Sequence, residues 1–420
     1  MKIALFTDAF TPEANGVAVS VNTLREGLLG RGHDVMVFTV SYPDAVPEPG
    51  VVRLPSVTFA PVPERRMARP IDPALYSLVR DAHFDVIHTH TEFIMGRFGY
   101  RAAVRLKIPR VHTYHTMYED LTSYVAPSAR LTGPAGRLAM YVSRRVCNHA
   151  DSVIAPTRKT RDRLLGYGVD TTIAVAPTGI DLDRFARADE HRLPGLRESL
   201  GIAPDARVVL SLGRVGFEKN ITQLVDEVTA YLSPSDPDAA ERRRGVVFLI
   251  VGDGRAMDSV KRQVARSGMA DRVFFTGEVP WSEVPQYYHL SDVLVSMSEA
   301  EAQGLTFVEA LAAGVPLVAK DNACFEGIVQ DGRSASLFRR VAEFPDRLDE
   351  ILFTQARDRY IAGGHAVANA LSVERFAERV EGIYQETIEA HPERLAARRP
   401  ARRRLVPPAR PLRSLPAGAP

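Results

Sequence analysis

The sequence predicts an α/β protein with two Rossmann-like, doubly wound domains and a cleft between them. Short apolar runs typical of buried strands alternate with longer amphipathic stretches typical of helices, which is the pattern of a parallel sheet. The alternation stops near residue 185 and restarts near residue 207, so we expect two separate sheets. A chain of 420 residues is long enough for two or three domains with full cores.

The first predicted domain spans residues 1–185. A helix is expected at residues 16–32, after the first strand, and the polar residues 186–206 are expected to be irregular. Parallel strands direct their carboxyl ends toward the cleft, so ligand-binding residues should follow the strands. Strands are predicted at residues 2–8, 34–40, 84–90, 110–116, 151–157 and 172–179.

The second predicted domain spans residues 195–372. Residues 233–245 interrupt it and are expected to form a surface insertion. A last helix near residues 373–390 is expected to pack back on the first domain, and the Arg/Pro-rich tail 391–420 is expected to be disordered. Strands are predicted at residues 207–213, 245–254, 272–277, 292–297 and 315–321.

Bulk properties are those of an ordinary soluble globular protein, with 25% charged and 8% aromatic residues. No apolar run reaches the ~18 residues of a membrane span, so any membrane contact should be peripheral. The two cysteines, Cys147 and Cys324, provide no disulfide framework and no metal-ligand spacing, which fits a reducing compartment. The chain starts with a predicted strand and no signal-peptide layout, so we expect a cytoplasmic protein.

Positive charge is concentrated in two segments, although the formal net charge is only +2. The tail 391–420 holds eight arginines and one glutamate, a net of +7, and residues 65–145 hold thirteen Lys/Arg against six Asp/Glu, again +7. The second segment contains a helix-spaced apolar face that suits an anionic membrane surface, the alternative being a solvated basic face. The apolar residues are Leu138, Tyr141 and Val142, and the flanking arginines are Arg137, Arg144 and Arg145.

Two glutamates flank a predicted helix start in SEAEAQGLTFVEALAAG. Glu301 and Glu309 lie eight positions apart, with Gly304 at the expected amino terminus of helix 305–313. Unbonded amides and the helix dipole there suit an anion, while carboxylates suit pairs of hydroxyl groups. A nucleotide sugar offers both phosphates and hydroxyls, and is the ligand that this motif predicts. The alternative is that both glutamates are solvated surface residues.

Basic residues follow the first strand of the second domain. Arg214 and Lys219 lie five positions apart on a strand-to-helix loop, where they could neutralise a diphosphate in place of a metal. A solvated charged loop is the alternative. In the first domain, Gly16 precedes a predicted helix, so its backbone could approach a ligand closely.

Four histidines follow two strands of the first domain: His88, His90, His112 and His115. Tyr114, Glu119 and Asp120 lie beside the second pair. Histidine here could form hydrogen bonds or shuttle protons, and a metal site is the alternative. The short aspartate patterns Asp181/Asp183 and Asp236/Asp238 have no convincing metal-binding context, so we expect no metal and no other cofactor.

The order of the motifs NGVA, HTYHT, PTGID, GRVGFEKN, E-x7-E and GLTFVEALAAGVP resembles glycosyltransferase family 4, which has the GT-B fold. The resemblance covers roughly residues 1–385 and implies a retaining transferase that uses a nucleotide sugar without a catalytic metal. HTHTEF, HTYHTMYED and EAQGLTFVEALA are similar to the glycolipid-forming subgroup, above all to diacylglycerol α-glucosyltransferases. Most of the wider family has Gly-Phe where this chain has Ala302-Gln303.

The resemblance implies roles for the residues that match the family's motifs. Gly16 matches the glycine loop near the donor phosphates, and His115 matches the histidine near the sugar and the reaction centre. Arg214 and Lys219 match the basic pair on the diphosphate. Glu301 matches the glutamate that contacts sugar hydroxyls. The residues expected to be catalytic are His115, Arg214, Lys219 and Glu301.

Donor contacts are also implied along the helix that follows. Glu309 matches the glutamate on the ribose diol. Gly304, Leu305 and Thr306 match the backbone donors beside the sugar and the phosphate. Closure of the two domains should bring Gly16 and His115 onto the donor and exclude water.

The expected function is transfer of a hexose, with retention, from a nucleotide sugar (UDP-glucose) to a membrane lipid such as diacylglycerol. The expected place is the inner face of the cell membrane, at an anionic surface, and no nucleic-acid partner is expected. A GDP-mannose-dependent lipid mannosyltransferase, a nucleotide-sugar epimerase and a non-catalytic sugar-binding module remain alternatives. An NAD dehydrogenase is disfavoured, because no G-x-G-x-x-G follows the first strand.

Overall fold

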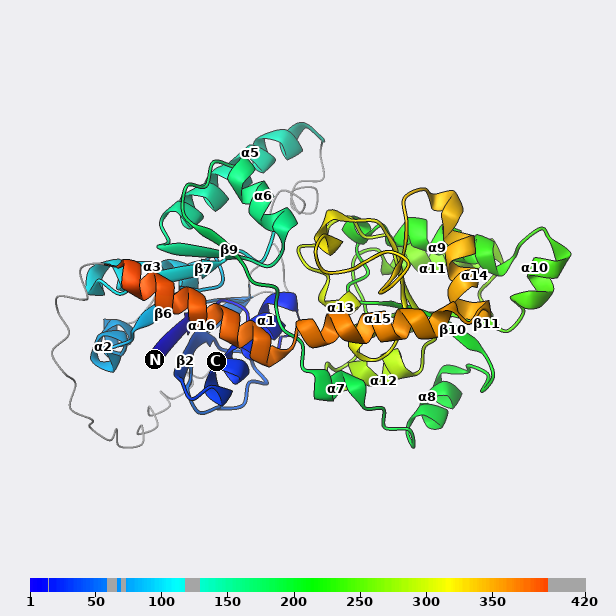
Figure 1. Ribbon diagram of the computed structural model, residues 1–420, viewed down its shortest axis with the longest axis horizontal. Coiled ribbons are helices and arrows are strands. Elements are labelled where there is room, and N and C mark those ends of the chain that lie inside the picture. The colour runs from blue at the N-terminus through cyan, green and yellow to red at the C-terminus, as the bar shows by residue number, and fades with distance from the viewer. Residues whose placement is uncertain (14, 59–65, 69–72, 118–128, 392–420) are drawn as a thin grey trace, which may run out of the picture.

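Two parallel sheets, each carrying helices, lie side by side in the computed structural model (Figure 1). The structure describes residues 1–391, except for residues 14, 59–65, 69–72 and 118–128. The predicted fold class, two doubly wound α/β domains, is confirmed. Glu119, Asp120 and the basic tail beyond His391 lie outside the described residues.

The first sheet has the strand order β3-β2-β1-β6-β7-β8-β9, and all neighbours pair in parallel. Central strand β1 is almost fully buried because helices cover both faces of the sheet. The strands are β1 (Lys2–Phe6), β2 (Asp34–Val40), β3 (Val51–Leu54), β6 (Val86–Thr89), β7 (Arg110–Thr113), β8 (Ser152–Ala155) and β9 (Ile173–Val175). A separate antiparallel pair, β4 (Ser56–Thr58) with β5 (Arg66–Ala68), was not predicted.

The helices of this half are α1 (Gly16–Gly30), α2 (Pro73–Ala82), α3 (Ile94–Leu106), α5 (Ala129–Asn148) and α6 (Arg158–Gly166). Helix α3 begins where the buried carboxylate of Asp8, at the end of β1, accepts hydrogen bonds from the Met95 amide and the Thr91 hydroxyl. That contact satisfies a helix-terminal donor that has no partner within the helix.

The second sheet has the strand order β12-β11-β10-β13-β14-β15. Its strand β11 has the sequence VVFLIV, and all its residues are buried, because one apolar core lies on each face of the sheet. The strands are β10 (Arg207–Leu212), β11 (Val246–Val251), β12 (Val273–Gly277), β13 (Val293–Ser296), β14 (Leu317–Lys320) and β15 (Ser336–Phe338). The helices include α9 (Ile221–Leu232), α11 (Met257–Ser267), α12 (Val284–His289), α13 (Leu305–Ala312) and α14 (Phe344–Phe353).

The stretch 186–206 was predicted as irregular but contains a helix, so that prediction was wrong in part, and the predicted surface insertion 233–245 contains a helix that was not predicted. Between the domains lie α7 (Leu182–Ala186) and α8 (Leu193–Leu200), and α8 ends at Gly201 in the left-handed conformation that glycine favours. The surface insertion contains α10 (Pro237–Arg242), which is capped by Asp236. Asp181 likewise caps α7.

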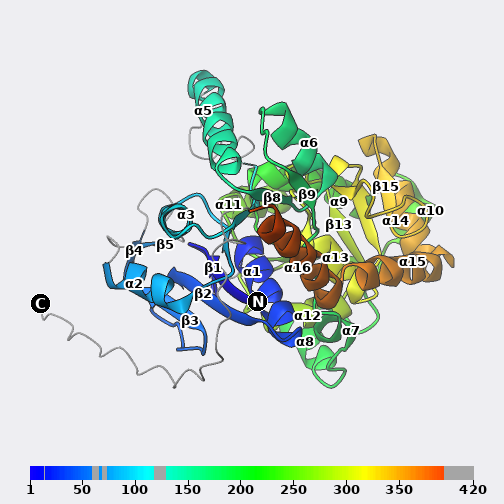
Figure 2. The same ribbon diagram turned by 60° about the vertical axis from the view of Figure 1, so that its left-hand side comes forward.

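The chain returns to the first half at its end. Helix α15 (Ala356–Ala370) packs on α13, and α16 (Val373–Ala390) packs on α1 (Figures 1 and 2). Gly27 of α1 lets the two helices approach closely, because an added Cβ would lie 2.7 Å from the Cβ of Ala377. The buried face of α16 thereby joins the core of the first sheet.

Candidate active site between the two domains

The amino termini of two helices, one from each half, face each other across the cleft. An added Cβ on Gly16, at the start of α1, would lie 3.7 Å from Cδ1 of Leu305, at the start of α13. The side chain of Asn15 caps α1 by accepting from the amides of Val17 and Ala18. Gly304 precedes α13 with a φ of 74°, and no side chain of the described residues caps that helix. The start of α13 therefore keeps amide donors for a ligand.

A charged cluster lies beside this helix start. Nζ of Lys219, in the short 3-10 helix η2 (Phe217–Lys219), is 2.5 Å from Oε1 of Glu301. One hydrogen bond thus joins Lys219, the cation predicted to bind a diphosphate, to Glu301, the carboxylate predicted to bind sugar hydroxyls. A single ligand with a sugar next to its phosphates could contact both.

Arg214 completes the basic edge of the site. It follows β10, and its guanidinium is 2.9 Å from Oε1 of Glu218, a neighbour that the sequence did not single out. An added Cβ on Gly213 would lie 3.8 Å from Cγ2 of Thr306. The loop after β10 and the first turn of α13 are therefore adjacent, as the predicted phosphate site requires.

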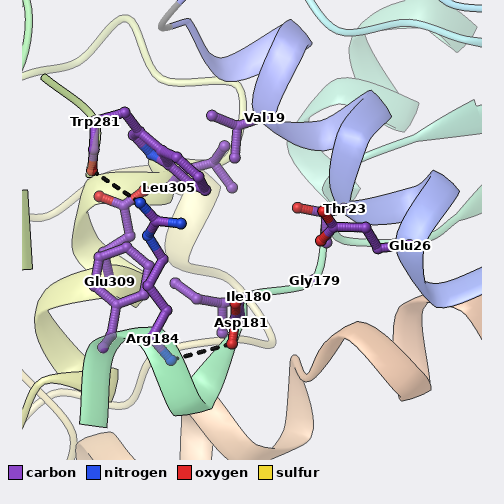
Figure 3. Close-up of a pocket in the computed structure, with 11 residues that line it drawn as sticks. Val19, Thr23, Glu26, Gly179, Ile180, Asp181, Arg184, Trp281, Leu305 and Glu309 are labelled. Atoms are coloured by element: carbon purple, nitrogen blue, oxygen red, sulfur yellow. Dashed lines mark hydrogen bonds between the residues drawn. The ribbon is translucent and has the colours of Figure 1, made fainter. Parts of the chain in front are cut away.

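Glu309 lies one turn further along α13, in a pocket that is partly open to solvent (Figure 3). The hydroxyl of buried Tyr288 donates to its Oε2 at 2.8 Å. Burial raises the pKa of the Glu309 carboxyl to about 7, against the opposing effects of the Tyr288 hydrogen bond and of nearby Arg184. Such a carboxyl can accept hydroxyl hydrogen bonds near neutral pH, and would accept them better when ionised.

The walls of this pocket come from both halves. Val19, Thr23 and Glu26 of α1 lie opposite the α13 side (Figure 3). The guanidinium of Arg184 lies 3.4 Å from the ring centroid of Trp281 and donates to the Trp281 carbonyl at 3.2 Å. Sequence reasoning missed Arg184, Trp281 and Tyr288, because no local motif marks them; that Trp281 is the sole tryptophan was the one available signal.

The histidines form a hydrogen-bonded group in the first half, in which His115 is half-buried and the other three are buried. Nδ1 of His90 is 3.0 Å from Nε2 of His115, and His88 bonds to the hydroxyls of Thr113 and Tyr384. Burial, with a contribution from His112, lowers the pKa of His115 to about 3. His115 is therefore neutral near pH 7, which fits a hydrogen-bonding role better than proton shuttling.

A metal alternative receives no support from the geometry of the described part of the chain. Within those residues, no group of three or more His, Cys, Asp or Glu side chains is arranged to hold an ion. The aspartates of the two short patterns have local partners instead. Asp181 and Asp236 cap helices, and Asp183 pairs with Arg187.

Comparison with known families and proteins agrees with this architecture. Residues 14–184 match Glycosyltransferase Family 4, and residues 194–364 match Glycosyl transferases group 1. Alpha-monoglucosyldiacylglycerol synthase of Streptococcus pneumoniae is 34% identical over 92% of this chain and 86% of its own length. The enzyme of that name from Acholeplasma laidlawii is 30% identical over 94% and 99%.

More distant relatives extend the comparison. D-inositol 3-phosphate glycosyltransferase of Actinosynnema mirum is 34% identical over 68% of either chain. Among solved structures, HepE of Anabaena in complex with UDP and glucose superposes with a TM-score of 0.71 at 20% identity, covering 92% of this chain and 100% of HepE. That likeness shows the GT-B fold. The family matches and the relatives of 30% or more identity show that the chain is a glycosyltransferase and belongs to glycosyltransferase family 4.

Proposed function

We propose that the protein transfers glucose from UDP-glucose to a membrane lipid such as diacylglycerol, with retention of configuration at the anomeric carbon. The observation that carries the donor assignment is the contact between Lys219 and Glu301 beside the uncapped start of α13. The lipid acceptor is supported by the two alpha-monoglucosyldiacylglycerol synthases, which match nearly the whole chain.

The donor would lie along α13. Its diphosphate would contact Arg214, Lys219 and the amides of Gly304, Leu305 and Thr306, while Gly16 faces it from the first half. The glucose hydroxyls would bond to Glu301 and the ribose diol to Glu309. On donor binding, Lys219 would exchange part of its contact with Glu301 for the phosphate.

Catalysis would rest on charge stabilisation at the departing UDP. The acceptor oxygen forms its bond to the anomeric carbon on the face from which the phosphate oxygen of UDP leaves. The proton of the acceptor hydroxyl passes to this departing phosphate oxygen. Lys219, Arg214 and the dipole of α13 stabilise the negative charge that develops there, without a metal. Neutral His115 would donate or accept one hydrogen bond to the sugar.

Helix α5 would bring the protein to the bilayer. It projects from the first domain (Figures 1 and 2), and Leu138 and Tyr141 are 63% and 58% exposed on it. Exposed arginines, including Arg145, accompany this apolar face. None of the helices in the described part of the chain has the length and apolar character of a bilayer span. We propose that α5 is an interfacial helix at the anionic inner face of the cell membrane.

A radiolabel transfer assay tests donor and acceptor together. UDP-glucose, UDP-galactose, UDP-N-acetylglucosamine and GDP-mannose are each offered with diacylglycerol vesicles or with D-inositol 3-phosphate. The proposal expects label in the lipid from UDP-glucose. If the lipid were labelled only from GDP-mannose, GDP-mannose and not UDP-glucose would be the donor. If only D-inositol 3-phosphate were labelled, it and not the lipid would be the acceptor. Release of free sugar without transfer would contradict the proposal.

A further inference from the structure

The loop that carries Glu301 is held by the opposite half of the molecule. It connects β13 to α13 and contains Ala302 and Gln303. Nothing in the proposed donor contacts requires a glutamine there. The contacts of Gln303 indicate a different role.

Gln303 pairs with both backbone groups of one residue, Thr178. The Thr178 amide donates to Oε1 of Gln303 at 2.7 Å, and Nε2 of Gln303 donates to the Thr178 carbonyl at 2.9 Å. Both residues are buried, with 7% and 5% of their surface exposed. The Thr178 hydroxyl lies 2.8 Å from that of Ser20 on α1. Gln303 therefore joins the donor loop to the first half, because Thr178 itself is tied to α1.

Two residues at the start of α6 hold the same loop from the first half. The Thr157 hydroxyl donates to the Ala302 carbonyl at 2.9 Å. Nζ of Lys159 donates to the carbonyls of Glu299 and Glu301 at 2.9 and 3.0 Å. Three backbone carbonyls of the loop are thus hydrogen-bonded by side chains that belong to the other domain.

We propose that Gln303 is a positioning residue that latches the donor loop onto the first half and so couples domain closure to the arrangement of Glu301. This inference rests on the proposed donor site. Separation of the halves would break both hydrogen bonds of the amide at once and release the loop. A phenylalanine at this position could form neither bond. The latch thereby makes the donor-binding arrangement a property of the closed molecule.

The test uses the full chain with Gln303→Leu, which removes both bonds, and Gln303→Glu, which keeps size and one acceptor. Gln385→Leu and Gln385→Glu, on the exposed face of α16, are matched controls. Calorimetry with UDP, small-angle scattering with and without UDP, and steady-state kinetics are the measurements. Because a buried amide pair is lost, we expect UDP affinity to fall roughly tenfold or more for Gln303→Leu, and at least as much for Gln303→Glu, whose buried carboxylate would face the Thr178 carbonyl oxygen.

The latch also predicts a change in shape. Free Gln303→Leu should have a larger radius of gyration than the wild type, and saturating UDP should reduce it. The donor KM should rise more than kcat falls, whereas loss of folded protein would lower kcat alone. Affinity, size and kinetics equal to those of the Gln385 controls would overturn the proposal.

Lys159→Met gives an independent check if Gln303→Leu folds poorly. It removes the hydrogen bonds that Lys159, in the first half, donates to the loop carbonyls. Like Gln303→Leu, it should weaken UDP binding and increase the radius of gyration of the free protein. An unchanged radius and affinity in this variant would contradict the latch. UDP binding and scattering do not depend on the acceptor, so the latch can fail while lipid glucosylation is confirmed, or hold while it is refuted.

Discussion

The strand ends of the two halves face the same cleft with opposite chemistry. In the first half they carry buried histidines, and burial lowers the pKa of His88, His90 and His115 so that the rings stay neutral. In the second half they carry ion pairs, Lys219 with Glu301 and Arg214 with Glu218. Ion pairs thus line the side where a diphosphate is proposed to bind, and the neutral histidines of the other side offer uncharged hydrogen-bonding groups.

A second pair of groups sharpens this comparison. Burial raises the pKa of Asp8 to about 6 and that of Glu309 to about 7. Asp8 uses its oxygens within the fold, on Thr91 and the start of α3. Among the residues that the structure describes, only the Tyr288 hydroxyl donates a side-chain hydrogen bond to Glu309, which lines the pocket. Similar burial therefore serves helix capping in one half and, we propose, ligand binding in the other.

The largest expected effect comes from removing charge in the second half. Arg214→Ala or Lys219→Ala should lower kcat/KM for UDP-glucose by roughly ten- to a hundredfold, because each charge-assisted contact contributes ~1.5–3 kcal/mol. Exposed Arg262→Ala on α11 is the control for lost surface charge. Steady-state kinetics on both variants measure the effect. Activity within twofold of wild type for both would show that the donor diphosphate does not bind at Arg214 and Lys219.

Next in size is the membrane contact of the first half. Leu138→Ser with Tyr141→Ser should weaken binding to anionic vesicles roughly tenfold, because two exposed apolar side chains lose the burial that the bilayer interface would give them. Leu165→Ser, at a residue 53% exposed on α6, is the control. Co-sedimentation at rising salt measures binding, which should weaken with salt for the wild type. Equal binding of the double variant and the control would show that α5 does not face the bilayer.

A smaller effect follows from the pKa of Glu309. A diol favours the ionised carboxylate, so donor binding should lower this pKa and the affinity should rise with pH toward about 7, where the free carboxyl titrates, and level off above it. The rise should not exceed ~10-fold per pH unit. Calorimetry with UDP-glucose between pH 5.5 and 8.5 tests this. Glu309→Gln should show a flat profile, and a flat wild-type profile would mean that Glu309 does not meet the ribose.

The smallest effect is expected from chelation. If Arg214, Lys219 and the helix dipole neutralise the diphosphate, EDTA should change the transferase rate by less than about twofold. The assay compares dialysed enzyme with and without EDTA. Complete loss of activity that Mg²⁺ or Mn²⁺ restores would show that a metal ion is needed to neutralise the diphosphate.

Local patterns predicted most strands, though not the short β3, β4, β5 and β15, and they predicted the helix start at Gly304, because buried parallel strands are continuous apolar runs and a helix start has recognisable residues. The helices α8 and α10 were missed although Pro194, Gly201 and Asp236 mark their ends. Tyr288 and Arg184 could not be found in this way. Their contacts with Glu309 and Trp281 arise from the packing of elements far apart in the chain.

The pairing of Gln303 with Thr178 shows the same limit. The sequence marked Gln303 as a departure from the family, but its partner lies 125 positions away and contributes only backbone groups, which no residue pattern reveals. The contact of Lys219 with Glu301 spans 82 positions. Residue types at strand ends could be predicted, whereas their partners required the structure.

The central claim is retaining transfer of glucose from a nucleotide sugar to diacylglycerol, and the configuration of the product tests it most directly. The enzyme is incubated with UDP-glucose labelled with ¹³C at the anomeric carbon and with diacylglycerol vesicles, and the extracted lipid is examined by NMR. The account predicts a glycolipid whose labelled carbon has the α configuration of the donor. A β-linked lipid would contradict retention, and an unlabelled lipid fraction with labelled free glucose would contradict the transfer itself.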